Sequence, residues 1–180
     1  MAVSHHRAVA PQRPDVRVAV ISVSDTRTFQ TDEGGALVES LATKAGFSIT
    51  ARDLVRDEPD AVRAQVNARV AAGDSDAILL TGGTGVAPRD GTVDAVSPLF
   101  DRRLDGFGEL FRALSFAEIG PAAMLSRATA GIVGGTAVFL MPGSPAAIRL
   151  AMDRLILPEL SHLIGELRRS PAPAPPAASR

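Results

Sequence analysis

The sequence contains no cysteine among its 180 residues. This absence excludes disulfide bonds, thiolate metal sites and a cysteine nucleophile, and it fits a reducing compartment. No apolar run approaches the roughly 18 residues that a membrane-spanning helix needs, and the N-terminal residues lack the apolar core of a signal peptide. We therefore expect a cytoplasmic protein without a membrane partner, whose chemistry rests on oxygen and nitrogen groups.

Net charge is almost absent as well. The 19 Lys and Arg residues nearly balance the 20 Asp and Glu residues, which gives a formal net charge of −1. Such a chain has no overall field that would attract nucleic acid, so no nucleic-acid partner is expected. Any anion that the protein binds must be held by local groups.

Composition and length indicate a single folded domain between two tails. Apolar residues make up 46% and charged residues 22%, close to the average of soluble globular domains. Residues 1–15 are polar and contain two prolines, and residues 169–180 are rich in Pro and Ala, so both are expected to be flexible. Residues 16–168 are long enough to bury one core and are expected to form one α/β domain.

Short apolar runs alternate with segments of helical periodicity along this domain. That alternation is typical of βαβ units and predicts a largely parallel sheet. The expected strands cover residues 16–23, 47–55 and 76–80, and the expected helices cover residues 36–45, 59–73, 92–100 and 107–119.

The last third of the domain departs from the parallel pattern. Gly134 and Gly135 separate two apolar runs, residues 128–133 and 136–141, and this composition favours a β-hairpin. One strand should therefore run antiparallel to the rest, which makes the sheet mixed. After the hairpin, Ser144 and Pro145 form a good helix start, and the helix should run to about residue 167 with a bend near residue 158, a proline.

The most informative stretch is the Gly-rich loop Thr81-Gly82-Gly83-Thr84-Gly85, which directly follows an expected strand. Glycines at the carboxyl end of a sheet strand let backbone N–H groups converge on an anion, so the loop indicates a phosphate cradle. It is neither a Walker loop nor the Gly-x-Gly-x-x-Gly dinucleotide pattern. A tight strand-to-helix turn is the alternative interpretation.

Two charged residues, Arg89 and Asp90, lie just beyond the Gly-rich loop. Asp90 can hold Mg²⁺ against phosphate oxygens, because Mg²⁺ in such sites takes one or two carboxylates together with substrate phosphates and water. The alternative is that Asp90 caps the helix that begins at Thr92.

Asp57 follows the second strand, and since the carboxyl ends of parallel strands share one edge, Asp57 and Asp90 are expected to face the same crevice. Asp57 is otherwise a helix N-cap.

Three more segments should reach this edge. Residues 22–26 end the first strand with two serines and Asp25, and Pro142-Gly143-Ser144 ends the last strand. Ser126 and Arg127 precede the antiparallel strand. Arg127 either binds phosphate through two hydrogen bonds or pairs with a neighbouring carboxylate.

These motifs together resemble the MoaB/MogA family of molybdenum-cofactor proteins, with the segment 114–120 closer to MoaB than to MogA. The resemblance covers roughly residues 16–167. It rests on five segments in a fixed order, which are residues 81–85 (TGGTG), 89–90 (RD), 106–109 (GFGE), 125–128 (LSRA) and 141–145 (MPGSP).

The resemblance implies a three-layer α/β/α sandwich with a mostly parallel, mixed sheet, the MogA-like fold. It also implies a trimer or hexamer, a pocket for molybdopterin with its phosphate on the Gly-rich loop, and other molybdenum-cofactor enzymes as partners. In the active branch of the family, ATP and Mg²⁺ are used to adenylylate molybdopterin. A protein of this family that binds molybdopterin without turnover is the alternative, and Gly91 stands where adenylylating members usually carry a branched residue.

The resemblance and the loop pattern together define the expected site. Asp57 and Asp90 are the expected catalytic residues, with Asp90 as the metal ligand, and Ser126 matches the serine associated with pterin binding. The expected substrate- and phosphate-binding residues are Asp25, Thr81, Gly82, Gly83, Thr84, Gly85, Ser126, Arg127, Pro142, Gly143 and Ser144.

One helix has more apolar surface than it needs to anchor itself. Phe107, Leu110, Phe111 and Leu114 share a face of the expected helix 107–119. Either this face supports self-association, or all four side chains face the core.

Overall fold

The computed structural model describes residues 15–169, and one mixed sheet of six strands runs through it. The predicted tails lie outside the described residues apart from Asp15 and Arg169. The strands are β1 (Arg17–Val23), β2 (Ser48–Val55), β3 (Ala77–Thr81), β4 (Arg102–Arg103), β5 (Thr129–Val133) and β6 (Thr136–Met141). Their order across the sheet is β2-β1-β3-β6-β5-β4.

The predicted mixture of parallel and antiparallel pairing is confirmed. Strands β2, β1, β3 and β6 are parallel to one another, whereas β5 pairs antiparallel with β6 and with β4. The turn between β5 and β6 is Gly134-Gly135, whose positive φ angles of 54° and 87° suit a hairpin. The short edge strand β4 was not expected from the sequence.

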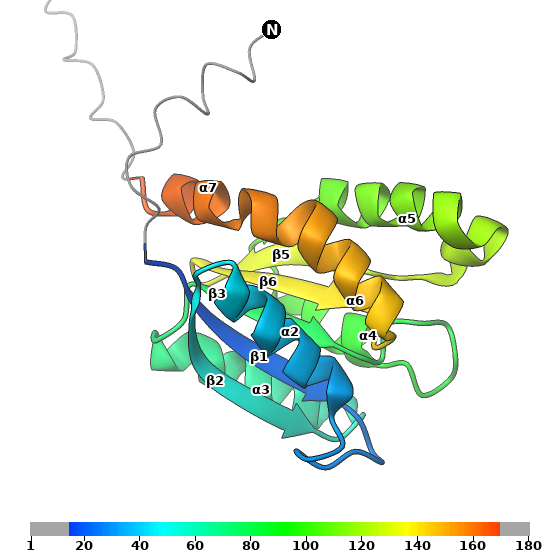
Figure 1. The fold of residues 1–180 in the computed structure, drawn as a ribbon. Coiled ribbons are helices and arrows are strands. Elements are labelled where there is room, and N and C mark those ends of the chain that lie inside the picture. The colour runs from blue at the N-terminus through cyan, green and yellow to red at the C-terminus, as the bar shows by residue number, and fades with distance from the viewer. Residues whose placement is uncertain (1–14, 170–180) are drawn as a thin grey trace, which may run out of the picture.

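Helices cover both faces of the sheet, which confirms the predicted three-layer sandwich (Figure 1). They are α2 (Glu33–Lys44), α3 (Pro59–Ala72), α4 (Thr92–Val96), α5 (Asp105–Ile119), α6 (Pro145–Ala151) and α7 (Leu157–Leu167). Two 3₁₀ segments (Ser97–Leu99, Gly120–Leu125) and a π-helical segment (Met152–Ile156) complete the helical elements. Helices α2, α5, α6 and α7 pack on one face, and α3 and α4 pack on the other.

The core lies in two layers because alternate strand residues point to opposite faces. Val18 and Val20 of β1 join the cluster under α2 and α5–α7, whereas Ala19 and Ile21 join the cluster over α3 and α4. Central strands buried on both faces explain why β1 and β3 read as continuous apolar runs.

Helix ends agree with most of the sequence signals. Helix α3 begins at Pro59, and Gly73 closes it in the left-handed conformation at φ 63°. The predicted C-terminal helix contains a π-helical segment, Met152–Ile156, which ends two residues before Pro158. Helix α2 begins at Glu33, three residues before the expected start.

The expected apolar face of α5 divides between core and surface. Phe107 and Phe111 are buried and Leu114 is partly buried, whereas Leu110 is 56% exposed. Neither alternative for this face is therefore fully realised. No helix among residues 15–169 is long and apolar enough to cross a membrane.

Candidate functional site

Loops from five strands meet at one edge of the sheet, as the sequence predicted. Strands β2, β1, β3 and β6 end there because they are parallel, and the antiparallel strand β5 begins there. Two hydrogen bonds join the ends of β3 and β6, from the Thr81 hydroxyl to the Pro142 carbonyl at 3.1 Å and from the Gly82 N–H to the Met141 carbonyl at 3.1 Å. The Gly-rich loop is thereby fixed against the loop that contains Gly143.

Beyond Gly82, the Gly-rich loop bonds to the rest of the protein through its carbonyl groups, and three of its N–H groups have no acceptor within residues 15–169. The Gly83 carbonyl accepts from the Thr92 N–H at 3.1 Å, and the Thr84 carbonyl accepts from the Arg127 N–H at 2.9 Å. The Gly85 carbonyl accepts from Arg127 Nε at 2.7 Å. Within residues 15–169, the N–H groups of Gly83, Thr84 and Gly85 donate to no acceptor. Three successive donors are therefore available to an anion.

Glycine is required at the turn of this loop for two reasons. Gly82 and Gly83 have φ angles of 110° and 64°, a region that other residues rarely adopt. In addition, a Cβ atom on Gly82 would lie 2.4 Å from the carbonyl oxygen of Val23, and one on Gly83 would lie 2.3 Å from Oγ1 of Thr92. A side chain at position 82 would displace the backbone of Val23, and one at position 83 would displace the side chain of Thr92.

The carboxylates of Asp57 and Asp90 lie close enough for their charges to interact. Burial raises the pKa of Asp57, the negative charge of Asp90 raises it further, and the Gly91 N–H only partly offsets these effects. Neither carboxylate caps a helix. The N-cap of α3 is Glu58 and that of α4 is Gly91, both without a side-chain cap, so the capping alternative does not hold for either aspartate.

Other bonds hold Asp90 and Asp25 in place. The Asp90 carboxylate accepts from the Ala87 N–H at 2.8 Å and packs against Gly85. Asp25 accepts from the Asp57 N–H at 3.1 Å and forms an ion pair with Arg89. Asp25 thus links the loops after β1, β2 and β3.

Of the two alternatives for Arg127, the structure shows the ion pair. Its Nη1 atom donates to both carboxylate oxygens of Asp94 at 2.9 Å, and Nη2 donates to the Asp90 carbonyl. Together with the bond from Nε to Gly85, these contacts use every nitrogen of the guanidinium group. Arg127 therefore supports the Gly-rich loop from behind in this structure.

Two cavities open on either side of the Gly-rich loop. One, of about 190 Å³, lies between Gly82 and the start of α2. Its lining is polar and apolar in nearly equal parts and consists of Ser22, Val23, Ser24, Arg27, Asp32, Glu33, Gly34, Thr81, Gly82, Gly143 and Pro145. The other, of about 200 Å³, lies beside Gly85 and the end of α5. Its lining consists of Thr84, Gly85, Phe111, Ser115, Ile119, Ala122, Ala123, Ser126, Pro142, Ser144 and Ala147.

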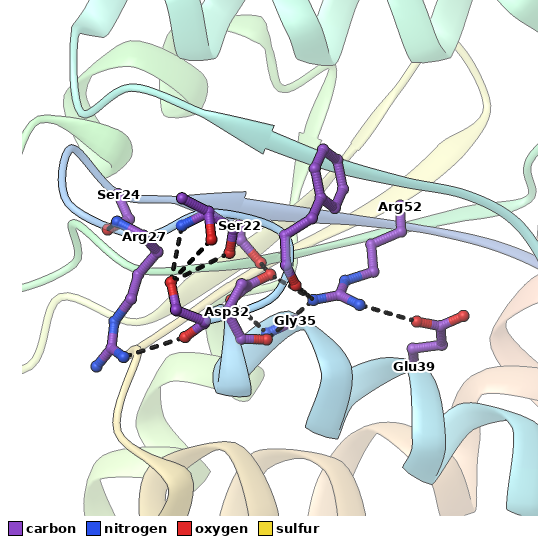
Figure 2. A network of polar contacts seen from close by, with 10 residues as sticks. Ser22, Ser24, Arg27, Asp32, Gly35, Glu39 and Arg52 are labelled. Atoms are coloured by element: carbon purple, nitrogen blue, oxygen red, sulfur yellow. Dashed lines mark hydrogen bonds and ion pairs between the residues drawn. The ribbon is translucent and has the colours of Figure 1, made fainter.

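A polar network that the sequence did not reveal forms one wall of the first cavity (Figure 2). Asp32 is 6% exposed, accepts from the Gly35 N–H at 2.9 Å and the Ser22 hydroxyl at 2.7 Å, and pairs with Arg52 at 3.0 Å. Burial raises the pKa of Asp32, but these donors outweigh burial and hold the pKa below its usual value. The sequence offered one signal for this network, an Asp residue at the start of α2. Gly34 and Gly35, in the first turn of that helix, made its start look like a loop.

The two carboxylates beside the Gly-rich loop fit a Mg²⁺ ion that also binds phosphate oxygens of a ligand. In the part of the chain that the structure describes, no group of three or more His, Asp or Glu residues is placed to hold a metal ion. Two neighbouring carboxylates beside three free N–H groups match the sites where Mg²⁺ takes one or two carboxylates and completes its shell with phosphate oxygens and water. Asp57 and Asp90 would be the residues that hold it.

Comparison with known proteins identifies the family. The family model described as the probable molybdopterin binding domain matches residues 19–162. Molybdenum cofactor biosynthesis protein B of Bacillus subtilis is 51% identical over 170 residues, covering 94% of this chain and 99% of that protein. A crystal structure of a molybdenum cofactor biosynthesis protein B matches with a TM-score of 0.86 at 46% identity, over 89% of this chain and 100% of that one. The tungsten cofactor synthesizing protein MoaB from Pyrococcus furiosus matches with a TM-score of 0.79 at 33% identity, over 89% of this chain and 100% of that one. The chain therefore belongs to the molybdopterin-binding-domain family that includes molybdenum cofactor biosynthesis protein B.

Proposed function

We propose that this protein binds molybdopterin at the carboxyl edge of the sheet, with the terminal phosphate on the Gly-rich loop. The observation that carries the proposal is the set of free N–H groups on Gly83, Thr84 and Gly85, whose carbonyls are all bonded to the protein. Converging N–H groups are a phosphate site in many folds. The names of the relatives, which are molybdenum cofactor biosynthesis proteins, support this ligand.

The 200 Å³ cavity beside Gly85 suits the ring system of a pterin. Its walls combine apolar side chains, Phe111 and Ile119, with the hydroxyl-bearing residues Ser115 and Ser126. Ligand sites of this kind bind a flat heterocycle through apolar contact and orient it through a few polar groups. Because the cavity borders the Gly-rich loop, a ligand seated there can place its phosphate on the free N–H groups.

We further propose that the protein adenylylates molybdopterin with ATP. A terminal phosphate oxygen of molybdopterin forms a bond to the α-phosphorus of ATP, and the bond from that phosphorus to pyrophosphate breaks. The free N–H groups of the loop stabilise the negative charge that shifts to the phosphate oxygens. Asp57 and Asp90 would hold Mg²⁺, which supplies positive charge to the same oxygens when it is bound.

A second candidate is a protein that binds molybdopterin without turnover. The observation that favours it is Gly91, because a Cβ atom at this position would lie 2.9 Å from Cγ of Pro59, so a branched residue would require the loop beside Asp90 to shift. The MoaB-like segment 114–120 points the same way.

Incubation of the full chain with molybdopterin, ATP and Mg²⁺ separates these candidates. The enzyme proposal predicts that pyrophosphate and adenylylated molybdopterin appear in equal amounts and in proportion to protein. Calorimetric binding of molybdopterin without product would support the second candidate. An absence of both binding and product would overturn the proposal as a whole.

We also propose that the protein works as a homo-oligomer, a trimer or a hexamer, in the cytoplasm, and passes its product to other molybdenum-cofactor enzymes. Support for self-association comes from a set of exposed apolar side chains on α5 and the following 3₁₀ segment, namely Leu110, Phe116, Ile119, Met124 and Leu125. An apolar groove of about 520 Å³ between α5 and α7 extends this surface. Large apolar patches of this kind mark interfaces between proteins.

A further inference from the structure

Two buried oxygen atoms beside the Gly-rich loop have no hydrogen-bond partner. They are Oδ1 of Asp57 and Oγ1 of Thr92, and neither has a partner among residues 15–169. Thr92 is completely buried, at 0% exposure. Native proteins rarely keep a buried polar atom unpaired, because its desolvation is not compensated, so such an atom is usually paired or hydrated.

The position of Gly83 shows that these two atoms border one small space. A Cβ atom built on Gly83 would lie 2.3 Å from Oγ1 of Thr92 and 3.0 Å from Oδ1 of Asp57. The Thr92 N–H also donates to the Gly83 carbonyl at 3.1 Å, which fixes the start of α4 against the loop. The missing side chain of Gly83 therefore leaves room for the hydroxyl and the carboxylate oxygen to interact.

A divalent cation does not suit this space. Thr92 is sealed from solvent, and Mg²⁺ gives up its water ligands reluctantly. A hydroxyl group, in contrast, rotates freely and both donates and accepts hydrogen bonds. Because Oγ1 of Thr92 and Oδ1 of Asp57 have no partner in the part of the chain that the structure describes, the hydroxyl donor and the carboxylate acceptor are available for each other.

We propose that Thr92 positions the Asp57 carboxylate by donating its hydroxyl hydrogen to Oδ1, directly or through one buried water molecule. This inference rests on the proposed function, since the position of Asp57 matters only if Asp57 acts at the phosphate site. The hydroxyl holds one oxygen of the carboxylate, and the carboxylate group therefore keeps one orientation toward Asp90 and the loop. Thr92 is a positioning residue that does not itself touch the substrate.

A double-mutant cycle on stability tests this contact without any activity measurement. Thr92→Val removes the hydroxyl and keeps the shape of the side chain, and Asp57→Ala removes the carboxylate. If the two groups interact, the loss of melting temperature in the double variant is smaller than the two single losses combined. The matched control is Thr136→Val, a buried threonine at the opposite end of β6, whose loss should add to that of Asp57→Ala. Additive losses for Thr92→Val and Asp57→Ala would overturn the proposal.

The kcat of Thr92→Val and its recovery in Thr92→Ser supply a second measurement, which a purely structural role of Thr92 would not change. In a protein that turns over, Thr92→Val should lower kcat by about a hundredfold, the effect expected of a displaced catalytic group, while KM for molybdopterin stays near the parental value. Thr92→Ser keeps the hydroxyl and should restore kcat. Parental kcat in Thr92→Val, or no rescue by serine, would contradict the positioning role. If the parent protein does not turn over, the double-mutant cycle alone decides, so failure of the proposed function and failure of this inference are distinguishable.

If Thr92→Val does not fold, a high-resolution crystal structure of the parent chain replaces the cycle. The proposal predicts either direct hydrogen-bond contact between Oγ1 of Thr92 and Oδ1 of Asp57 or one ordered water molecule that touches both. Two separate oxygens with no shared water would overturn it.

Discussion

At the carboxyl edge of the sheet, a residue contacts a ligand most readily through atoms that are not already hydrogen-bonded to the protein. Asp90 accepts a hydrogen bond from Ala87, whereas a buried oxygen of Asp57 has no partner among residues 15–169. Arg127 is a cation beside the phosphate loop, yet Asp94 and two carbonyl groups occupy its nitrogens. The N–H groups of Gly83, Thr84 and Gly85, which have no acceptor within residues 15–169, consequently remain as donors for an anion.

The first prediction concerns Asp90→Asn, which keeps the size of the side chain and can still accept from the Ala87 N–H. The free energy of unfolding of this variant should change by no more than about 1 kcal/mol, because only the exposed hydrogen bond from the Ala87 N–H is affected. Turnover of molybdopterin and ATP should fall by about a hundredfold or more, since charge stabilisation at the reacting phosphate is lost. Molybdopterin binding should survive, as the loop N–H groups carry it.

Asp153→Asn, an exposed residue on the π-helical segment, serves as the matched control and should behave like the parent protein. Denaturant titration, calorimetry and a pyrophosphate assay report the three quantities. An Asp90→Asn variant that turns over at the parental rate would show that Asp90 is not needed for charge stabilisation.

At the level of residues, sequence patterns predict neighbours better than bonds. The approach of Asp57 to Asp90 agrees with the strand order, because Asp57 follows β2, Asp90 lies in the loop between β3 and α4, and these parallel strands end at the same edge. The choice of Asp94 as the partner of Arg127 and the burial of Thr92 depend on how α4 packs under the loop. No local pattern contains that information.

Among the elements, helix α2 depends on a buried cap that also forms part of the site. Asp32 caps the helix and binds Ser22 of β1 and Arg52 of β2, so one carboxylate connects three elements. A Cβ atom on Gly35 would lie 2.2 Å from the Asp32 carboxylate, so glycine is required in the first turn. Glycines in a first turn resemble a loop in sequence, which explains why α2 was expected to start later.

The second prediction concerns the pH dependence of this cap. The pKa of Asp32 lies below its usual value of 3.8, so the ionised carboxylate stabilises the folded protein above about pH 4, and this stability is lost as the pH falls through the folded pKa. Asp32→Asn should lower the free energy of unfolding by about 2 kcal/mol at neutral pH, as hydrogen bonds to a charged group are lost. The difference from the parent should shrink below about pH 4.

Urea titrations of parent and variant between neutral and acid pH measure this difference. Asp153→Asn, which changes an exposed aspartate, should show no such dependence. A loss that is equally large at every pH would mean that the charge of Asp32 does not contribute.

For the whole molecule, the sheet determines both the location of the site and the surface that remains apolar. Parallel strands bring four loops to one edge, and alternation between apolar runs and helical segments was enough to predict this arrangement. Composition could not predict how α5 divides its apolar residues, because that depends on the angle at which α5 crosses β5. Leu110 and Phe116 remain on the surface as a result.

The third prediction is self-association through this surface. Sedimentation at micromolar concentration should show a species several times larger than the 18.7 kDa chain. Phe116→Glu places a charge on a side chain that is 59% exposed, so it should weaken assembly without unfolding the chain. The control is Arg63→Glu, which places the same charge on α3, on the opposite face of the sheet. This variant should assemble like the parent. A parent protein that sediments only as a monomer would exclude self-association.

The central claim is that a phosphate-bearing pterin binds on the Gly-rich loop, and calorimetric titration of molybdopterin into Gly83→Val tests it most directly. Valine there cannot readily adopt φ 64°, and its side chain would displace that of Thr92, so the loop that holds the phosphate could not keep its conformation. Gly73→Val is the matched control, because Gly73 has nearly the same φ of 63° but open space around it and lies at the end of α3. We predict that the parent and Gly73→Val bind molybdopterin and that Gly83→Val, checked as folded by circular dichroism, does not. Parental affinity in a folded Gly83→Val protein would contradict the claim.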